Sequence, residues 1–295
     1  MSEGVGATHQ TLVIRGIRYH FETVGDGPPL LLLHGFMGAR RSWHALDGRL
    51  APGHRRIALD LLGHGQSEGP LQVQGYGMAE AVSDLDAICD ALGLGQTAVL
   101  GYSMGGRLAL SLALLRPWRV SRLILESASP GIQAKGAREA RRLADQALAR
   151  RLVEEGLPAF VEAWEQLPLF FSQRALESSV RQDLRAIRLS HEPVGLARSL
   201  LAMGVGSQPY WGECLSDLTV PTLLIAGDRD DKYRDLAKSM AEHIPRAETA
   251  IVADAGHNVH LEQPERFLQW VNIFLGSPSP PSAFPTDAHG DARQR

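Results

Sequence analysis

Cysteine is scarce in this 295-residue sequence, which contains only Cys89 and Cys214. The two lie far apart and show neither CxxC nor metal-ligand spacing, so we expect two ordinary thiols and no disulfide framework. An excess of positive charge is also missing, because the net charge at neutral pH is −3. A protein that binds nucleic acid needs basic side chains to neutralise phosphates, and the charge balance therefore argues against such a partner.

Long apolar segments are lacking as well. No apolar run reaches the length of a membrane span, and the first nine residues are polar and glycine-bearing, with no apolar signal core. We therefore expect a cytoplasmic protein without a membrane partner. The remaining composition, 44% hydrophobic and 21% charged, is that of a globular protein, and the length suffices for one large domain with an insertion.

The segment 97–115 carries the pattern around which the chain is organised. β-Forming residues at 97–100 lead into Gly101-Tyr102-Ser103-Met104-Gly105, and a helical pattern follows at 108–115. A strand, a sharp turn with glycine on either side of a serine, and a helix are typical of the nucleophile elbow of α/β hydrolases. Glycine and serine are common, so the string alone is weak; its flanking elements favour the functional interpretation.

Apolar periodicity predicts eight strands. The first two, 11–14 and 17–24, alternate apolar and polar residues and form a hairpin. The runs 30–33, 56–59 and 122–125 are typical of strands buried on both faces, and the other strands are expected at 97–100, 220–226 and 249–252. Helical patterns lie between them at 78–92, 108–115 and 234–243, and after the last strand at 264–275. This alternation predicts the α/β-hydrolase fold, with a mostly parallel, doubly wound sheet.

Residues 129–207 differ from the rest because they contain only helical patterns, at 138–155, 157–165, 176–189 and 194–203. Helices inserted between sheet strands would cover the carboxyl ends of those strands, where ligands bind in open α/β sheets. We therefore expect a core of 10–128 and 208–276 with a helical cap of 129–207. The segment 277–295 is rich in proline, serine and glycine, and we expect it to be a disordered tail.

A catalytic triad follows from the order of three side chains. Serine is a poor nucleophile or base unless an imidazole takes its proton and a carboxylate orients that imidazole. His257 follows the last strand and Asp230 the strand before it, at the sheet edge that carries Ser103. Asp228 and Asp231 are rivals to Asp230, but the first turns back toward its strand and the second begins a helix.

Two further features surround this site. The fold supplies oxyanion donors from the residue after the nucleophile and from the loop after an early strand, which are here the N–H groups of Met104 and Phe36. His257 and His260 suggest a metal pair, but no carboxylate-bearing ligand helix accompanies them, so we assign no metal and no cofactor. The loop at 63–67 (Gly-His-Gly-Gln-Ser) is explained as a tight turn without a chemical role.

Beyond the triad, several motifs resemble one family, the 2-succinyl-6-hydroxy-2,4-cyclohexadiene-1-carboxylate synthases of menaquinone biosynthesis. These motifs are His34-Gly35-Phe36-Met37-Gly38, Asp60-Leu61-Leu62-Gly63-His64-Gly65, Gly101-Tyr102-Ser103-Met104-Gly105-Gly106-Arg107, Glu126-Ser127-Ala128-Ser129-Pro130-Gly131, Trp164-Glu165-Gln166-Leu167-Pro168-Leu169-Phe170 and Gly204-Val205-Gly206-Ser207-Gln208-Pro209. The match runs from about 12 to 275 and includes the cap, where related proteins usually diverge.

The resemblance implies a carbon–oxygen lyase. Such an enzyme eliminates pyruvate from 2-succinyl-5-enolpyruvyl-6-hydroxy-3-cyclohexene-1-carboxylate, with Ser103, activated by His257 and Asp230, as a general base and no acyl-enzyme. It also implies a pocket for a small polycarboxylate, since arginine pairs with carboxylates in a bidentate manner. The substrate-binding residues implied are Tyr102, Arg107, Arg141, Trp164 and Arg188. Most arginines on helices are merely solvated, and an aromatic residue in a cap helix is more often core.

Two other classes of protein remain open from the sequence. A serine hydrolase acting on an ester or a carbon–carbon bond would use the same triad with Ser103 as nucleophile. A binding protein that keeps the fold without catalysis is a second alternative, since fold does not dictate function. An intact set of Ser103, Asp230 and His257 argues against the latter. We expect a monomer or a small homo-oligomer.

Overall fold

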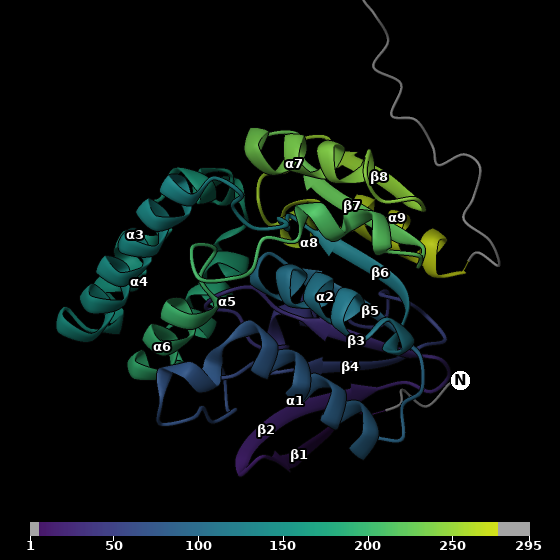
Figure 1. Cartoon of the computed structure of the whole chain (residues 1–295), viewed down its shortest axis with the longest axis horizontal. Helices are drawn as coiled ribbons and strands as arrows, with labels where there is room; N and C mark the ends of the chain where they lie inside the picture. The colour runs from purple at the N-terminus through teal and green to yellow at the C-terminus, as the bar shows by residue number, and fades with distance from the viewer. Residues whose placement is uncertain (1–5, 277–295) are drawn as a thin grey trace, which may run out of the picture.

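An eight-stranded sheet runs through the computed structural model, which describes residues 6–276 (Figure 1). Its strands are β1 (Thr8–Ile14), β2 (Ile17–Val24), β3 (Pro29–Leu33), β4 (Arg55–Leu59), β5 (Thr97–Tyr102), β6 (Val120–Glu126), β7 (Thr222–Gly227) and β8 (Ala247–Val252). They lie in the order β1-β2-β4-β3-β5-β6-β7-β8. β2 pairs antiparallel with β1 and with β4, and the other neighbours are parallel. The predicted α/β-hydrolase fold is confirmed.

Helices cover both faces of the sheet because its central strands are apolar on both sides. Leu31 and Leu33 of β3 belong to one buried cluster, on the first face of the sheet, whereas Leu30 and Leu32 belong to a second cluster, on the opposite face. The helices of the first face are α1 (Met78–Ala91), α2 (Met104–Leu115) and α7 (Asp231–Ala241). The second face carries the 3-10 helix η1 (Arg40–Leu46), α8 (Val259–Glu262) and α9 (Pro264–Gly276). Burial on both faces is what the continuous apolar runs predict.

Between β6 and β7 the chain forms α3 (Lys135–Glu154), α4 (Leu157–Glu165), α5 (Ser178–Leu189) and α6 (Pro193–Met203), gathered beside one end of the sheet (Figure 1). These helices share a buried apolar cluster of their own, which includes Leu152, Phe160 and Leu196. One core residue, Met37 from the loop after β3, belongs to that cluster. The cap helices and the loop after β3 are therefore packed as one unit.

Element boundaries differ from the sequence-based expectations in a few places. β7 begins at Thr222 and not at Val220, because Pro221 lacks the N–H that a central strand needs. The 3-10 helices η2 (Val73–Tyr76), η3 (Pro117–Arg119), η4 (Pro168–Ala175) and η5 (Gly212–Asp217) and the short helix α8 were not predicted. The expected tail at 277–295 lies outside the described residues. Across residues 6–276, no helix combines the length and apolar character that crossing a membrane requires.

Candidate active site

The turn between β5 and α2 forces Ser103 into an unusual backbone conformation, with φ 51° and ψ −106°. Both flanking glycines are required by close backbone approaches. A Cβ on Gly101 would lie 2.3 Å from the carbonyl oxygen of Gly105, and one on Gly105 would lie 2.1 Å from that of Leu33. The Ser103 amide donates to the carbonyl of Glu126 at 2.8 Å, which ties the turn to β6. This is the geometry of a nucleophile elbow.

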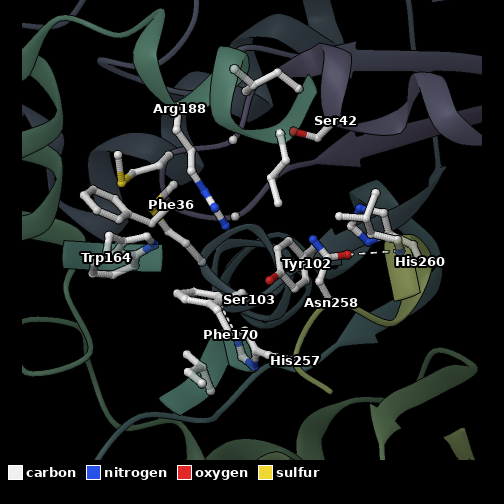
Figure 2. Close-up of a pocket in the computed structure, with 18 of the residues that line it drawn as sticks. Phe36, Ser42, Tyr102, Ser103, Trp164, Phe170, Arg188, His257, Asn258 and His260 are labelled. Carbon is white, nitrogen blue, oxygen red and sulfur yellow. Dashed lines mark hydrogen bonds between the residues drawn. The ribbon is translucent and has the colours of Figure 1, made fainter. Parts of the chain in front are cut away.

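Ser103, His257 and Asp230 form a continuous hydrogen-bonded chain, of which Figure 2 shows Ser103 and His257. Ser103 Oγ lies 3.0 Å from Nε2 of His257, and Nδ1 of His257 lies 2.7 Å from Oδ2 of Asp230. With Nδ1–H donated to the carboxylate, Nε2 is free to accept the hydroxyl proton. The other Asp230 oxygen accepts the amide of Tyr233 at 3.3 Å. The three side chains that the sequence singled out are therefore brought together.

The two rival carboxylates have other surroundings. Asp231 is exposed in the first turn of α7 and pairs with Arg234 at 2.6 Å. Asp228 donates its backbone amide to the carbonyl of Val252, which holds it beside β8. Of the three neighbouring aspartates, it is Asp230 whose side chain is hydrogen-bonded to His257.

Two backbone amides beside Ser103 are open to a ligand. Met104 is the first residue of α2, where an amide has no partner within the helix, and Phe36 lies in the loop after β3. Within residues 6–276, neither amide donates to a protein acceptor, and both residues line the same cavity. The N-terminus of α2 carries the positive end of the helix dipole, which makes the electrostatic potential beside these amides more positive. An oxygen carrying negative charge can be held at this place.

A cavity of about 540 Å³ lies between the sheet and the cap, with Ser103 and His257 in its wall. Aromatic rings form much of that wall: Trp164 packs against Phe36 at 5.3 Å and against Phe170 at 5.6 Å between ring centroids (Figure 2). The Tyr102 ring lies 5.5 Å from that of His257, and burial raises the pKa of its hydroxyl well above the usual value. The volume and mixed lining suit a small organic ligand.

Four arginines line the cavity: Arg107, Arg141 and Arg188, which the family motifs imply, and Arg41, which they do not. Arg141 pairs with Asp145 at 2.8 Å, and Arg188 pairs with Glu165 at 3.1 Å. Arg107 is buried and donates only to neutral acceptors in the described chain, the carbonyl of Met203 at 2.6 Å and the side-chain oxygen of Gln208. Burial lowers the pKa of Arg107 to about 10, so it stays charged at neutral pH. A buried cation without a carboxylate partner is suited to an anionic ligand.

His257 and His260, to which the sequence assigned no metal, belong to two different hydrogen-bond networks. Nδ1 of His260 lies 2.7 Å from Oε2 of Glu126, and its backbone amide donates to the other oxygen of that carboxylate at 3.0 Å. Its ring packs on Trp43, with centroids 4.6 Å apart. The spacing of His257 and His260 in sequence therefore reflects two separate networks, one reaching Ser103 and one anchoring α8 to β6.

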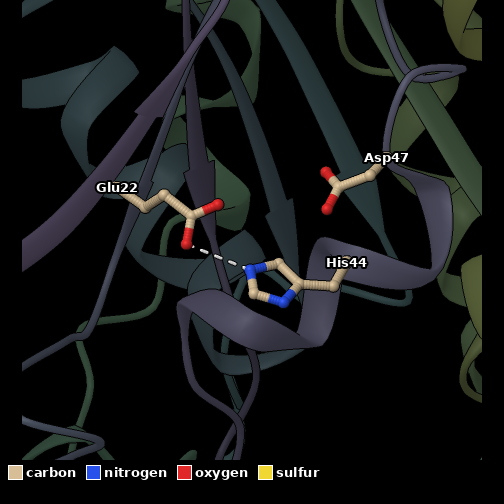
Figure 3. Close-up of side chains that lie close together, drawn as sticks. All are labelled: Glu22, His44 and Asp47. Carbon is tan, nitrogen blue, oxygen red and sulfur yellow. Dashed lines mark hydrogen bonds and ion pairs between the residues drawn. The ribbon is translucent and has the colours of Figure 1, made fainter. Parts of the chain in front are cut away.

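Glu22, His44 and Asp47 bring potential metal ligands within 4.8 Å of one another (Figure 3). Their atoms are already engaged, however. Nε2 of His44 lies 3.1 Å from Glu22, and Asp47 accepts from the guanidinium of Arg56 at 3.3 Å. A permanent positive charge beside one ligand opposes the binding of a dication. We interpret the cluster as a hydrogen-bonded network.

Sequence reasoning missed other residues near the triad. The Tyr233 ring lies 4.5 Å from that of His257, and Phe170 approaches the same imidazole at 6.1 Å. Tyr233 stands three residues after Asp230, at a helical spacing that offered a signal. Phe170 comes from η4, a segment whose irregular sequence offered none beyond the family motif that contains it.

An eight-stranded sheet with two antiparallel pairings at one edge, a serine elbow and an Asp–His pair after later strands define an α/β-hydrolase-fold protein. Consistently, the family model described as "alpha/beta hydrolase fold" matches residues 28–264. Within that large class, the relatives are more specific. A protein of Bacillus subtilis strain 168, provisionally named 2-succinyl-6-hydroxy-2,4-cyclohexadiene-1-carboxylate synthase, is 42% identical over 266 residues, which cover 89% of this chain and 96% of that protein.

The synthase of the same name from Salmonella agona is 35% identical over 245 residues, covering 83% of this chain and 92% of that protein. Among solved structures, MenH from S. aureus has a TM-score of 0.84 at 34% identity, covering 87% of this chain and 97% of that one. The chain belongs to the 2-succinyl-6-hydroxy-2,4-cyclohexadiene-1-carboxylate synthase family.

Proposed function

We propose that this protein eliminates pyruvate from 2-succinyl-5-enolpyruvyl-6-hydroxy-3-cyclohexene-1-carboxylate to give 2-succinyl-6-hydroxy-2,4-cyclohexadiene-1-carboxylate, a step of menaquinone biosynthesis. The observation that carries the proposal is that the hydrogen-bonded Ser103–His257–Asp230 chain opens into a cavity whose lining includes four arginines. Membership of the synthase family supports the same reaction.

In the proposed reaction, Ser103 is the general base. Its Oγ takes a proton from a ring carbon of the substrate while its own proton passes to Nε2 of His257, and Asp230 stabilises the imidazolium that results. The electron pair of the broken C–H bond spreads onto the succinyl carbonyl, where the N–H groups of Phe36 and Met104 stabilise the negative charge. The pair then forms a ring double bond as the C–O bond to the enolpyruvyl group breaks.

The proton held by His257 returns to the leaving group, which ends as pyruvate, and Ser103 regains its hydroxyl. No covalent intermediate is required, because the serine accepts a proton and does not attack carbon. We further propose that Arg107, Arg141 and Arg188 bind the carboxylates, with Tyr102 and Trp164 as aromatic walls. Arg107 is best suited to this role, since its guanidinium has only neutral protein partners.

The same triad would serve a serine hydrolase, so the test must separate the two reactions. Purified protein is mixed with the enolpyruvyl substrate, and pyruvate is followed by coupling to lactate dehydrogenase, with a blank without protein. We expect pyruvate in stoichiometric amounts and no burst that would indicate an acyl-enzyme. If no pyruvate were released while aryl esters were hydrolysed rapidly, the hydrolase would replace the lyase.

The matched variant is Ser103→Ala, for which kcat should fall by about three orders of magnitude or more. Full activity in that variant would exclude both triad mechanisms. We further propose that the enzyme needs no cofactor, acts on a small molecule and works in the cytoplasm. We also propose that it is a monomer or a small homo-oligomer, and sedimentation of the purified protein measures this oligomeric state.

A further inference from the structure

Three buried histidines lie in a row beneath the loop that carries Phe36. The ring of His64 is 5.2 Å from that of His34 and 5.4 Å from that of His191, and all three side chains are at most 4% exposed. His34 and His64 come from the core motifs after β3 and β4, whereas His191 comes from the cap, between α5 and α6. None of the three lines the cavity, so the reaction described above assigns them no role.

The hydrogen bonds of two of these rings determine their tautomers. Nε2 of His34 accepts the amide of Leu61 at 3.0 Å, so a neutral ring carries its proton on Nδ1 and donates it to the Gly35 carbonyl at 2.8 Å. Nδ1 of His191 accepts the amide of Gly65 at 2.9 Å, so its proton sits on Nε2 and is donated to the Met37 carbonyl at 3.0 Å. Burial lowers the pKa of both imidazoles, which keeps them neutral.

These two donations hold the backbone on either side of Phe36. In a planar trans peptide the carbonyl of Gly35 and the N–H of Phe36 point in opposite directions, so holding that carbonyl also orients the amide. The chain then passes through Met37, whose φ of 60° is strained for a residue other than glycine. The Met37 carbonyl is held by a side chain of the cap, and the Met37 side chain is buried in the cap cluster.

We propose that His191 is a positioning residue: by donating Nε2–H to the Met37 carbonyl, it holds the loop of Phe36 so that the Phe36 amide meets the negative charge that develops in the reaction. The cap thus shapes the oxyanion site as well as covering it. The backbones of Gly63 and Gly195 support this link, since a Cβ on Gly63 would lie 2.8 Å from the carbonyl oxygen of Gly195. The loop at 63–67 thereby acquires a function, because its Gly65 amide donates to Nδ1 of His191 and holds that ring in place.

Two amide variants separate the two hydrogen bonds of His191. In His191→Asn the side-chain oxygen takes the place of Nδ1 and accepts from Gly65, but nothing donates to Met37. In His191→Gln the longer side chain brings its amide nitrogen to the place of Nε2 and keeps that donation. We expect kcat for pyruvate release to fall about ten- to hundredfold in the Asn variant, since small misplacements of catalytic groups have effects of this size. The Gln variant should stay within about threefold of the native kcat.

Because His191 does not line the cavity, KM should change less than about twofold in both variants. A purely structural role would lower thermal stability and activity in parallel and would not distinguish Asn from Gln. Equal kcat values in the two variants, or a loss confined to KM, would overturn the proposal. The matched control is His243→Asn, an exposed histidine that also contacts a backbone carbonyl, that of Ser239 at 2.8 Å, and it should leave kcat unchanged.

The positioning role rests on the proposed function only for its kinetic readout. ¹⁵N chemical shifts of the native histidines test it without substrate, and they should report a proton on Nε2 of His191. The backbone amide resonance of Phe36 should move in the Asn variant and stay in the Gln variant. If the native protein releases no pyruvate, the proposed function fails, but these chemical shifts still test whether His191 positions the loop of Phe36. A proton on Nδ1 of His191, or an unchanged Phe36 amide resonance in the Asn variant, would refute the positioning role even if the enzyme is active.

Discussion

Nδ1 of His257 and Oδ2 of Asp230 lie 2.7 Å apart, and both side chains are almost fully buried. An amide in place of the carboxylate would neither stabilise the imidazolium nor maintain the tautomer that leaves Nε2 free. We therefore expect Asp230→Asn to lower kcat by about three to four orders of magnitude with little change in KM. Steady-state pyruvate release measures both constants.

The control for that variant is Asp231→Asn, which changes the neighbouring carboxylate. Its side chain is 83% exposed and pairs with Arg234, so its removal should alter kcat less than about twofold. Similar losses in the two variants would mean that Asp230 is not the carboxylate of the triad.

Arg107 offers a prediction in which binding and stability change in different directions. Its buried guanidinium donates to a backbone carbonyl and to Gln208, and within residues 6–276 no carboxylate is hydrogen-bonded to it. In Arg107→Met we expect kcat/KM to fall about ten- to hundredfold, mostly through KM, because binding of a substrate carboxylate is lost. The melting temperature should not fall, since replacing an unbalanced buried charge by an apolar side chain is neutral or stabilising.

Steady-state kinetics and thermal unfolding of the same preparation test both parts. Arg142→Met is the control, because Arg142 is partly exposed on α3 and pairs with Glu139 outside the cavity. An unchanged KM in the Arg107 variant would remove this residue from the substrate site.

The buried histidines predict that stability falls in mild acid. Burial lowers the pKa of His34 from 6.5 to about 4, and it shifts His64 and His191 in the same direction. As the pH falls below 6.5, the unfolded chain binds protons that the folded protein does not, so the free energy of unfolding decreases. Each such group contributes about 1.4 kcal/mol per pH unit until its folded pKa is reached, which amounts to roughly 3 kcal/mol for His34.

Urea unfolding between pH 7 and pH 4.5 measures this dependence. His34→Gln removes one titrating group, and its slope below pH 6.5 should be shallower by about 1.4 kcal/mol per pH unit. The native slope in that variant would show that His34 does not remain neutral in the folded protein.

Much of the architecture could be predicted from local patterns. The central strands were recognised because a strand buried on both faces needs an apolar run, and the hairpin at the edge was recognised because its residues alternate. The elbow was recognised because its two glycines meet a local steric requirement. In the structure, a Cβ at Gly105 or Gly101 would lie only 2.1 Å or 2.3 Å from a backbone carbonyl oxygen. The 3-10 helices were missed, since single irregular turns have no periodicity that a sequence window can detect.

The sequence by itself determined the fold class, the order Ser103, Asp230, His257 along the chain, and the family. Only the tertiary structure decided which partners these residues have. His257 is hydrogen-bonded to Asp230 and not to the neighbouring aspartates, and His260 is hydrogen-bonded to Glu126, 134 positions away in the sequence. His191 of the cap is hydrogen-bonded to the carbonyl of Met37. Backbone preferences and apolar periodicity act within a few residues, whereas hydrogen bonds between buried groups depend on packing that only the folded chain creates.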